Sequence, residues 1–165
     1  MIEIYNDALT NDELIYLKKE CDSFTITSQP YTSVDKKSYN FYVRNSLNKK
    51  NEFSFYKKIL NNNDINYKIE GIWLNKVNIE TNKNDDYHTD VCDLSIVIFL
   101  NDDFEGGEFE YMDNFGKSNK IKPEKNKAIV MDKKLPHRVL PVISGERFTL
   151  VCFLEHIKKQ TKSLI

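Results

Sequence analysis

The sequence predicts a mainly β domain with N-terminal helices, and three observations lead to this fold class. From residue 69 onward, short apolar and β-branched runs alternate with turn clusters, a pattern typical of a sandwich or barrel. Two earlier segments have the periodicity of amphipathic helices. The 165 residues, 40% of them hydrophobic, can bury one core. We therefore predict a single domain over residues 1–165, with an N-terminal buttress (1–66) and a core (67–157).

The N-terminal part is predicted to mix strands and helices. Residues 2–5 alternate like a short strand. Thr10 and Glu13 form a capping-box pattern, and an apolar stripe that begins at Leu14 predicts a helix over residues 11–22. Residues 38–44 are aromatic and alternate, which indicates a strand. A second amphipathic helix is predicted around residues 53–60.

The core region is predicted to consist of strands joined by turns. Six strands are expected, at residues 69–79, 94–101, 108–112, 128–132, 137–142 and 147–155. Gly106-Gly107 and residues 113–119 are among the turn clusters that separate them. Residues 94–100 are almost wholly apolar, as expected for a strand that is covered on both faces.

Composition limits the classes of function. The net charge of −1 provides no overall field that would attract nucleic acid or a membrane. The three cysteines show no C-x-x-C spacing, so we expect free thiols rather than disulfides or a zinc ribbon. No run of about eighteen apolar residues and no signal-peptide pattern is present. These features predict a soluble, cytoplasmic protein.

Two histidines and one aspartate are candidate metal ligands. In an extended segment the side chains of His88 and Asp90 point the same way, although this motif alone also fits a polar loop or a calcium site. His137 opens a predicted strand, and the third histidine, His156, lies at the Lys-rich tail. Two His and one carboxylate can occupy one face of an octahedral Fe(II) and leave positions open.

Arg147 is a candidate anion-binding residue. It begins a predicted strand that is apolar on both faces, and alternation places Thr149 and Phe153 on its own face. A buried guanidinium needs a partner, which is either an internal carboxylate or the carboxylate of a ligand. The Thr149 hydroxyl could add a hydrogen bond to such a ligand.

Taken together, residues 87–153 resemble the prolyl 4-hydroxylase-like branch of the 2-oxoglutarate- and Fe(II)-dependent dioxygenases. The matching segments are HTD at 88–90, LSIVIFLNDD at 94–103, EGGEFE at 105–110, HRVLPV at 137–142 and SGERF at 144–148. This resemblance implies a double-stranded β-helix, which is a jelly-roll or cupin-like barrel, with N-terminal helices against one sheet.

The resemblance also implies roles for individual residues. His88, Asp90 and His137 would ligate Fe(II), and Arg147 would bind the distal carboxylate of 2-oxoglutarate, with O2 as the second co-substrate and ascorbate as a reductant. Related enzymes often add a Tyr hydroxyl at that carboxylate. Phe99 occupies one such position here, so Thr149 and Asn78 are the candidate replacements. Tyr87 and Phe153 are candidate substrate contacts, and no catalytic residue beyond the metal ligands is predicted.

The predicted reaction is hydroxylation of an unactivated carbon with release of succinate and CO2, and peptidyl proline is the leading substrate. Alternatives are a free amino acid, nucleic acid, or a non-catalytic cupin-like binding protein. Residues 91–93 lack the Arg that peptidyl-prolyl hydroxylases often carry after this motif. The expected partner is a peptide or protein rather than a membrane, and the oligomeric state is not predicted. If the substrate is a peptide, residues 28–37 and 81–86 are predicted to form lids over the iron.

Overall fold

The computed structural model describes residues 1–22, 39–42, 53–55, 67–80 and 86–157. In this part of the chain the fold is mainly antiparallel β, as the sequence predicts. None of the helices in these ranges has the length and apolar character needed to cross a membrane.

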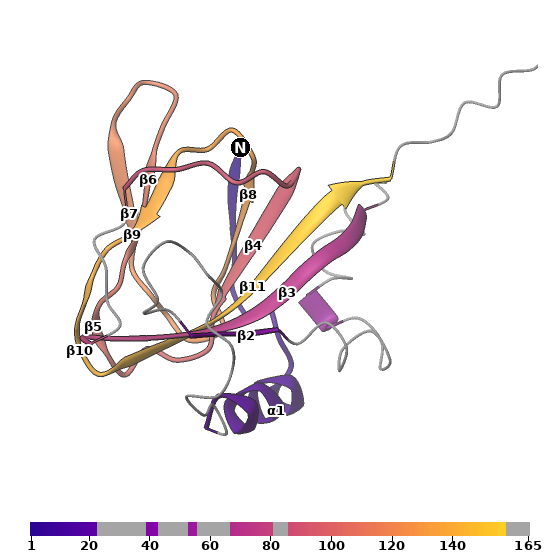
Figure 1. Cartoon of the computed structure of the whole chain (residues 1–165), viewed down its shortest axis with the longest axis vertical. Coiled ribbons are helices and arrows are strands. Elements are labelled where there is room, and N and C mark those ends of the chain that lie inside the picture. The colour runs from indigo at the N-terminus through magenta and orange to yellow at the C-terminus, as the bar shows by residue number, and fades with distance from the viewer. Residues whose placement is uncertain (23–38, 43–52, 56–66, 81–85, 158–165) are drawn as a thin grey trace, which may run out of the picture.

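The largest sheet has six strands in the order β1-β8-β4-β11-β3-β2, and each neighbouring pair is antiparallel (Figure 1). Its strands are β1 (Ile2–Tyr5), β2 (Tyr39–Tyr42), β3 (Tyr67–Asn78), β4 (Leu94–Phe99), β8 (Ala128–Asp132) and β11 (Glu146–His156). We call this the major sheet.

Two smaller sheets face it. The minor sheet has the order β7-β6-β9, and a further two-stranded sheet pairs β10 with β5. The strands are β5 (Glu105–Gly106), β6 (Phe109–Met112), β7 (Ser118–Ile121), β9 (His137–Val139) and β10 (Val142–Ser144). In Figure 1 the minor sheet stands across from β8 and β4. Two antiparallel sheets packed face to face are consistent with a jelly roll.

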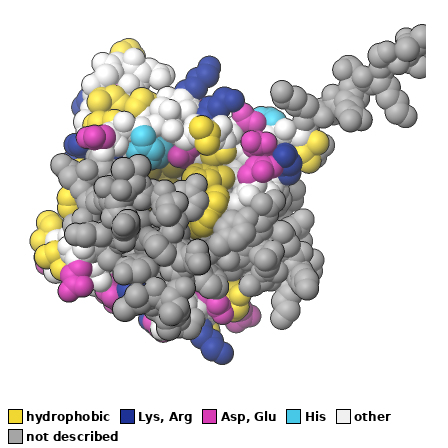
Figure 2. Space-filling view, in the orientation of Figure 1, with side chains coloured by type: hydrophobic (Ala, Val, Ile, Leu, Met, Phe, Trp, Pro, Cys, Tyr) yellow, Lys and Arg dark blue, Asp and Glu magenta, His cyan; other side chains and the backbone are white. Residues whose placement is uncertain are grey.

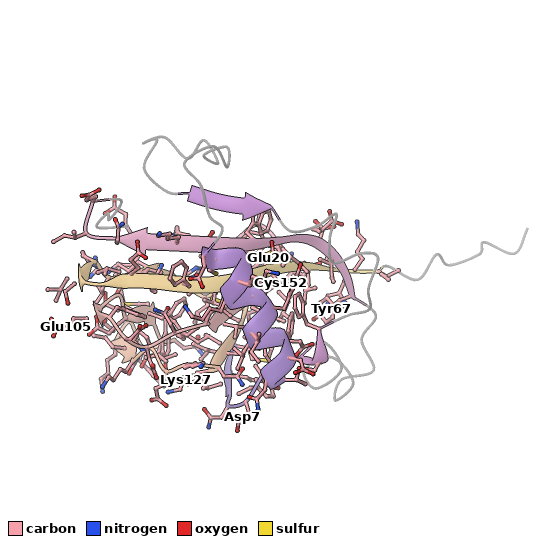
Figure 3. The ribbon with its side chains drawn as sticks, turned by 90° about the horizontal axis from the view of Figure 1, so that it is seen from below. Asp7, Glu20, Tyr67, Glu105, Lys127 and Cys152 are labelled. Carbon is pink, nitrogen blue, oxygen red and sulfur yellow. The ribbon has the colours of Figure 1, made fainter. Side chains whose placement is uncertain are left out.

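Strand alternation divides the apolar residues of the major sheet between two clusters. Ile96 and Ile98 of β4 pack in a cluster with Leu17 and Cys21 of helix α1 (Asn11–Asp22). Figure 3 shows α1 crossing this outer face, over the strand that carries Cys152. On the opposite, inner face, Phe99 packs with residues of β8 and of the minor sheet. The inner face therefore looks into the space between the sheets.

Helix α1 confirms the helix predicted over residues 11–22. The Thr10 N–H donates to Glu13 Oε2 at 2.7 Å, and the Glu13 N–H donates to Thr10 Oγ1 at 3.3 Å, which together are the two bonds of a capping box. The second predicted helix lies mostly outside the described residues. In the described ranges the predicted N-terminal helices are represented by α1 and by two helical residues, Ser54 and Phe55.

Most predicted strands are confirmed, and three predictions need correction. Gly106, predicted as a turn residue, pairs with Val142 as part of β5. The segment 137–142 forms two strands, β9 and β10, rather than one, because Pro141 has no N–H for a ladder. Strand β7 begins at Ser118, inside the segment predicted as a turn. The three cysteines are free, as predicted, and all three are buried.

Candidate metal centre

A backbone bridge joins His88 to His137 at the start of β9. The His88 N–H donates to the His137 carbonyl and the His137 N–H donates to the His88 carbonyl, each at 2.9 Å. Directly opposed residues of an antiparallel pair have their side chains on one face. The two ring centroids consequently lie 4.5 Å apart, although the residues are distant in sequence.

Hydrogen bonds fix the tautomer of both imidazoles. Nδ1 of His88 lies 3.1 Å from the Asp86 carbonyl, and Nδ1 of His137 lies 3.0 Å from the Leu135 carbonyl. Because a carbonyl only accepts, each Nδ1 carries the proton and each Nε2 keeps a lone pair for a metal. Burial lowers the pKa of His137, and the Phe109 ring stacks on its imidazole at 5.2 Å. His137 is therefore held in the neutral form that binds metals.

Asp90 completes the cluster. The Ser95 hydroxyl donates to Asp90 Oδ2 at 2.5 Å, and the same oxygen lies 3.8 Å from His137 Nε2. His88, Asp90 and His137 each offer a ligand atom, and these atoms lie within 4.8 Å of one another. In Figure 2 a histidine reaches the surface next to acidic and hydrophobic side chains. This donor set, with one exposed and one buried histidine, fits a non-haem Fe(II) with open coordination positions.

Residues 74–155 match the family model of the 2OG-Fe(II) oxygenase superfamily, a range that includes all three donors and Arg147. The chain belongs to this superfamily. Membership implies Fe(II), 2-oxoglutarate and O2, which are the cofactor and co-substrates predicted from the sequence.

Individual relatives agree with that family assignment. A PKHD-type hydroxylase from Alteromonas mediterranea is 34% identical over 65 residues, which span 38% of this chain and 28% of the relative. A 2OG-Fe(II) oxygenase family protein from Burkholderia pseudomallei superposes with a TM-score of 0.75 at 19% identity, over 93% of this chain and 85% of that one. A Pseudomonas putida prolyl-4-hydroxylase gives 0.67 at 14%, over 94% and 92%. At these identities the structural likeness establishes the shared fold.

Arg147 is buried at the start of β11, as the sequence predicts. Its side chain is 7% exposed, and Nη1 donates to the Gly107 carbonyl at 3.2 Å. Gly107 has a φ of +66°, and a Cβ built there would lie 3.2 Å from Arg147 Cδ. A side chain at residue 107 would therefore press on the arginine stem, and glycine leaves room for it.

Thr149 and Phe153 share the inner face with Arg147. The alternate residues Leu150 and Cys152 belong to the cluster beneath α1, so the other set must face the opposite way. Phe153 is the direct strand partner of Ser95, whose hydroxyl bonds Asp90. Phe153 is thus next to the metal cluster.

An aromatic pair borders the metal cluster on the inner face. The Trp73 and Phe153 rings meet edge to face with centroids 4.8 Å apart. The indole lies over Gly71, where an added Cβ would come within 2.1 Å of Trp73 Cη2. Trp73 is therefore a site-lining residue that the sequence reasoning missed.

Two predicted site residues do not share the inner face. Asn78 is the strand partner of Glu146, whereas Arg147 is opposite Val77, so Asn78 points to the outer face. Its Oδ1 accepts a hydrogen bond from the Glu80 N–H at 3.0 Å. The residue of β3 that lies opposite Thr149 is Asn75. The asparagine of β3 that shares the inner face with Thr149 is therefore Asn75, and the predicted Asn78 lies on the other face.

Tyr87 is the second residue that lies away from the metal cluster. It precedes His88, so alternation turns its side chain to the other face of the bridge. Its hydroxyl donates to Ser118 Oγ at 3.2 Å, and the Arg138 guanidinium lies over its ring at 4.6 Å. Arg138 in turn pairs with the buried Glu110. These contacts place the Tyr87 side chain against the minor sheet, on the side of the bridge opposite the imidazoles.

Proposed function

We propose that this chain is a 2-oxoglutarate- and Fe(II)-dependent dioxygenase that hydroxylates an unactivated carbon, with peptidyl proline as the substrate and succinate and CO2 as co-products. The observation that carries the proposal is the pair of Nε2 lone pairs presented beside the Asp90 carboxylate. The buried Arg147 on the inner face of the major sheet supports the co-substrate assignment.

In this proposal His88, Asp90 and His137 would hold the Fe(II), and Arg147 with Thr149 would bind the distal carboxylate of 2-oxoglutarate. When bound, the iron supplies O2 activation coupled to oxidative decarboxylation, with one oxygen atom entering succinate and the other the hydroxylated product. The carbonyls of Asp86 and Leu135 orient the imidazoles. Phe99 and Phe109 keep the inner side of the site apolar and exclude water.

The surroundings of the metal cluster support a peptide with an apolar ring. The half-buried Trp73–Phe153 pair offers ring faces and edges against which a pyrrolidine can pack. Val91 directly follows Asp90 and is 99% exposed, so it is available to a large substrate. A viral collagen prolyl hydroxylase from Paramecium Bursaria Chlorella virus-1 is a fold neighbour at 20% identity and a TM-score of 0.63, over 95% of this chain and 96% of that one, which adds support from analogy.

Further elements of the proposal concern organisation. Residues 67–157 would form the catalytic core, with residues 1–66 as its buttress. Residues 28–37 and 81–86 would act as lids, and both ranges lie almost wholly outside the described residues. Specificity carried by loops on a rigid barrel is the common arrangement in such scaffolds.

The direct test uses the Fe(II) protein with 2-oxoglutarate, ascorbate and a peptide library. We expect succinate formation and a product heavier by one oxygen atom on proline-containing peptides. The His137→Ala variant should lose both signals, whereas His156→Ala should retain them because the His156 ring packs against Tyr67, outside the cluster. Hydroxylation of free proline with none on peptides would contradict the peptide assignment. Absence of 2-oxoglutarate-dependent chemistry with every substrate class would contradict the enzyme assignment.

A further inference from the structure

Three residues form a row across the centre of the inner face. Thr149 of β11 is the direct partner of Asn75 on β3 and of Phe99 on β4. Arg147 is the next inward-facing residue along β11, opposite Val77, so it lies diagonally across from Asn75. Diagonal neighbours in an antiparallel pair lie about 7–8 Å apart, within reach of a long side chain. The Asn75 amide is therefore next to both predicted carboxylate-binding residues.

The Asn75 side chain is half-buried, and its carbonyl oxygen has no hydrogen bond. Its Oδ1 is inaccessible to solvent, and no partner for it exists within the described residues. A buried polar atom without a partner opposes folding, so the unpaired amide oxygen of Asn75 needs an explanation. Asn78 on the same strand provides a contrast, since its Oδ1 accepts the Glu80 N–H. The difference indicates that Asn75 keeps its hydrogen-bonding capacity for a ligand.

The chemistry of the amide matches the co-substrate. A side-chain amide has two N–H donors, and rotation about its Cβ–Cγ bond exchanges the oxygen and nitrogen positions. An N–H that donates to a carboxylate makes a charge-assisted hydrogen bond, which is stronger than a neutral one. Phe99, the other member of the row, has no hydroxyl to offer. A donor for the carboxylate must therefore come from another position on this face.

We propose that the Asn75 amide donates a hydrogen bond to the 2-oxoglutarate carboxylate that Arg147 binds, and that Asn75 and Thr149 together take the place of a tyrosine hydroxyl. The inference rests on the proposed function for the identity of the co-substrate. It assigns Asn75 as a binding residue of this chain, on the opposite face of β3 from the asparagine that the sequence suggested.

The test is calorimetric titration of 2-oxoglutarate into the Mn(II)-loaded protein, which requires no turnover. We expect Asn75→Leu to weaken 2-oxoglutarate binding by about tenfold, because it loses one hydrogen bond to a charged group. The thermal midpoint of the ligand-free protein should stay unchanged or rise, since a buried unsatisfied group is removed. A structural role for Asn75 would instead lower the midpoint and leave the affinity unchanged, and that result would overturn the inference.

Two further variants sharpen the test. Asn78→Leu is the matched control on the same strand, and it should bind 2-oxoglutarate like the wild type. Asn75→Asp keeps the side-chain volume but sets a carboxylate beside Arg147, so we expect a higher midpoint without ligand and a larger loss of affinity. Wild-type affinity in Asn75→Asp would overturn the inference and leave the proposed function standing. Conversely, weaker binding in both Asn75 variants supports the inference even where the wild-type protein hydroxylates no peptide, which would contradict only the proposed substrate.

Discussion

Replacing Ser95 by alanine should weaken metal binding without a metal ligand being touched. Ser95 lies fully buried on β4, and its hydroxyl donates to Asp90 Oδ2. The substitution removes one oxygen atom from a site with little solvent, because the Asp90 side chain is only 14% exposed. Loss of an outer hydrogen bond to a ligand typically costs 10–100-fold in metal affinity, or roughly 1.4–2.7 kcal/mol. A net value of about 1.5–3 kcal/mol for a hydrogen bond to a charged group gives the same range.

The assay for Ser95→Ala is competition between the protein and a chromophoric chelator for Mn(II). Cys92→Ala is the matched control: its Sγ lies 3.0 Å from the same Ser95 hydroxyl, but Asp90 keeps its donor. We expect the control to bind Mn(II) within about threefold of the wild type, since only a weak thiol contact is lost. A folded Ser95→Ala protein with unchanged Mn(II) affinity would show that Asp90 needs no orientation by β4 and would refute the reasoning.

Four other predictions follow from the same structure. Alanine at any of the three metal ligands should lower substrate-coupled succinate formation by roughly two orders of magnitude or more, with little change in the thermal midpoint, because no redundant ligand exists among the described residues. Arg147→Gln should weaken 2-oxoglutarate binding by about 10–100-fold in calorimetry while sparing Mn(II) affinity, and Arg147→Lys should be milder because it keeps the charge. The Ser118 hydroxyl and the Arg138 guanidinium lower the pKa of Glu110, so its ionised form stabilises the fold. The difference in midpoint between the wild type and Glu110→Gln should thus be present at pH 7 and vanish as the pH falls through that lowered pKa; a difference that persists in acid would contradict the ion pair. Deletion of residues 28–37 should impair peptide turnover but spare uncoupled decarboxylation of 2-oxoglutarate, and normal peptide turnover by the deleted protein would rule out that lid.

Sequence patterns predicted the elements whose residues repeat strongly. A capping box and an apolar stripe located α1, and alternation or continuous apolar character located β1, β4 and β8. Strand β7 was not predicted because three of its four residues are polar and two of these are exposed, so the segment has no apolar periodicity. Its hydrogen bonds come from β6, and only the fold supplies that partner.

The metal ligands were predictable because their chemistry demands particular residue types. Histidine is rare in this chain, and a carboxylate two positions from His88 is the simplest way to place two donors on one side of an extended segment. The hydrogen bonds that fix the imidazoles were beyond sequence reasoning, since they involve backbone carbonyls. The role of Ser95 could not be predicted either, because the sequence does not show that a serine inside an apolar strand has Asp90 as its hydrogen-bond partner.

The asparagine predicted on β3, Asn78, lies on the outer face, although the alternation of apolar residues along this strand could have identified its face. On β3 the apolar residues Ile72 and Leu74 face the cluster beneath α1, whereas Trp73 and Asn75 lie on the inner face. A register shift by one residue exchanges these two faces. The number of residues between β3 and the HTD motif at 88–90 therefore does not determine which asparagine of β3 faces inward. Alternation does determine it, because Asn78 is an even number of residues from Leu74 and shares its face, whereas Asn75 is adjacent to Leu74 and lies on the opposite face. In a strand whose apolar face packs beneath a helix, the opposite face is the one left to line a site, and its polar residues are the ones to test for ligand binding.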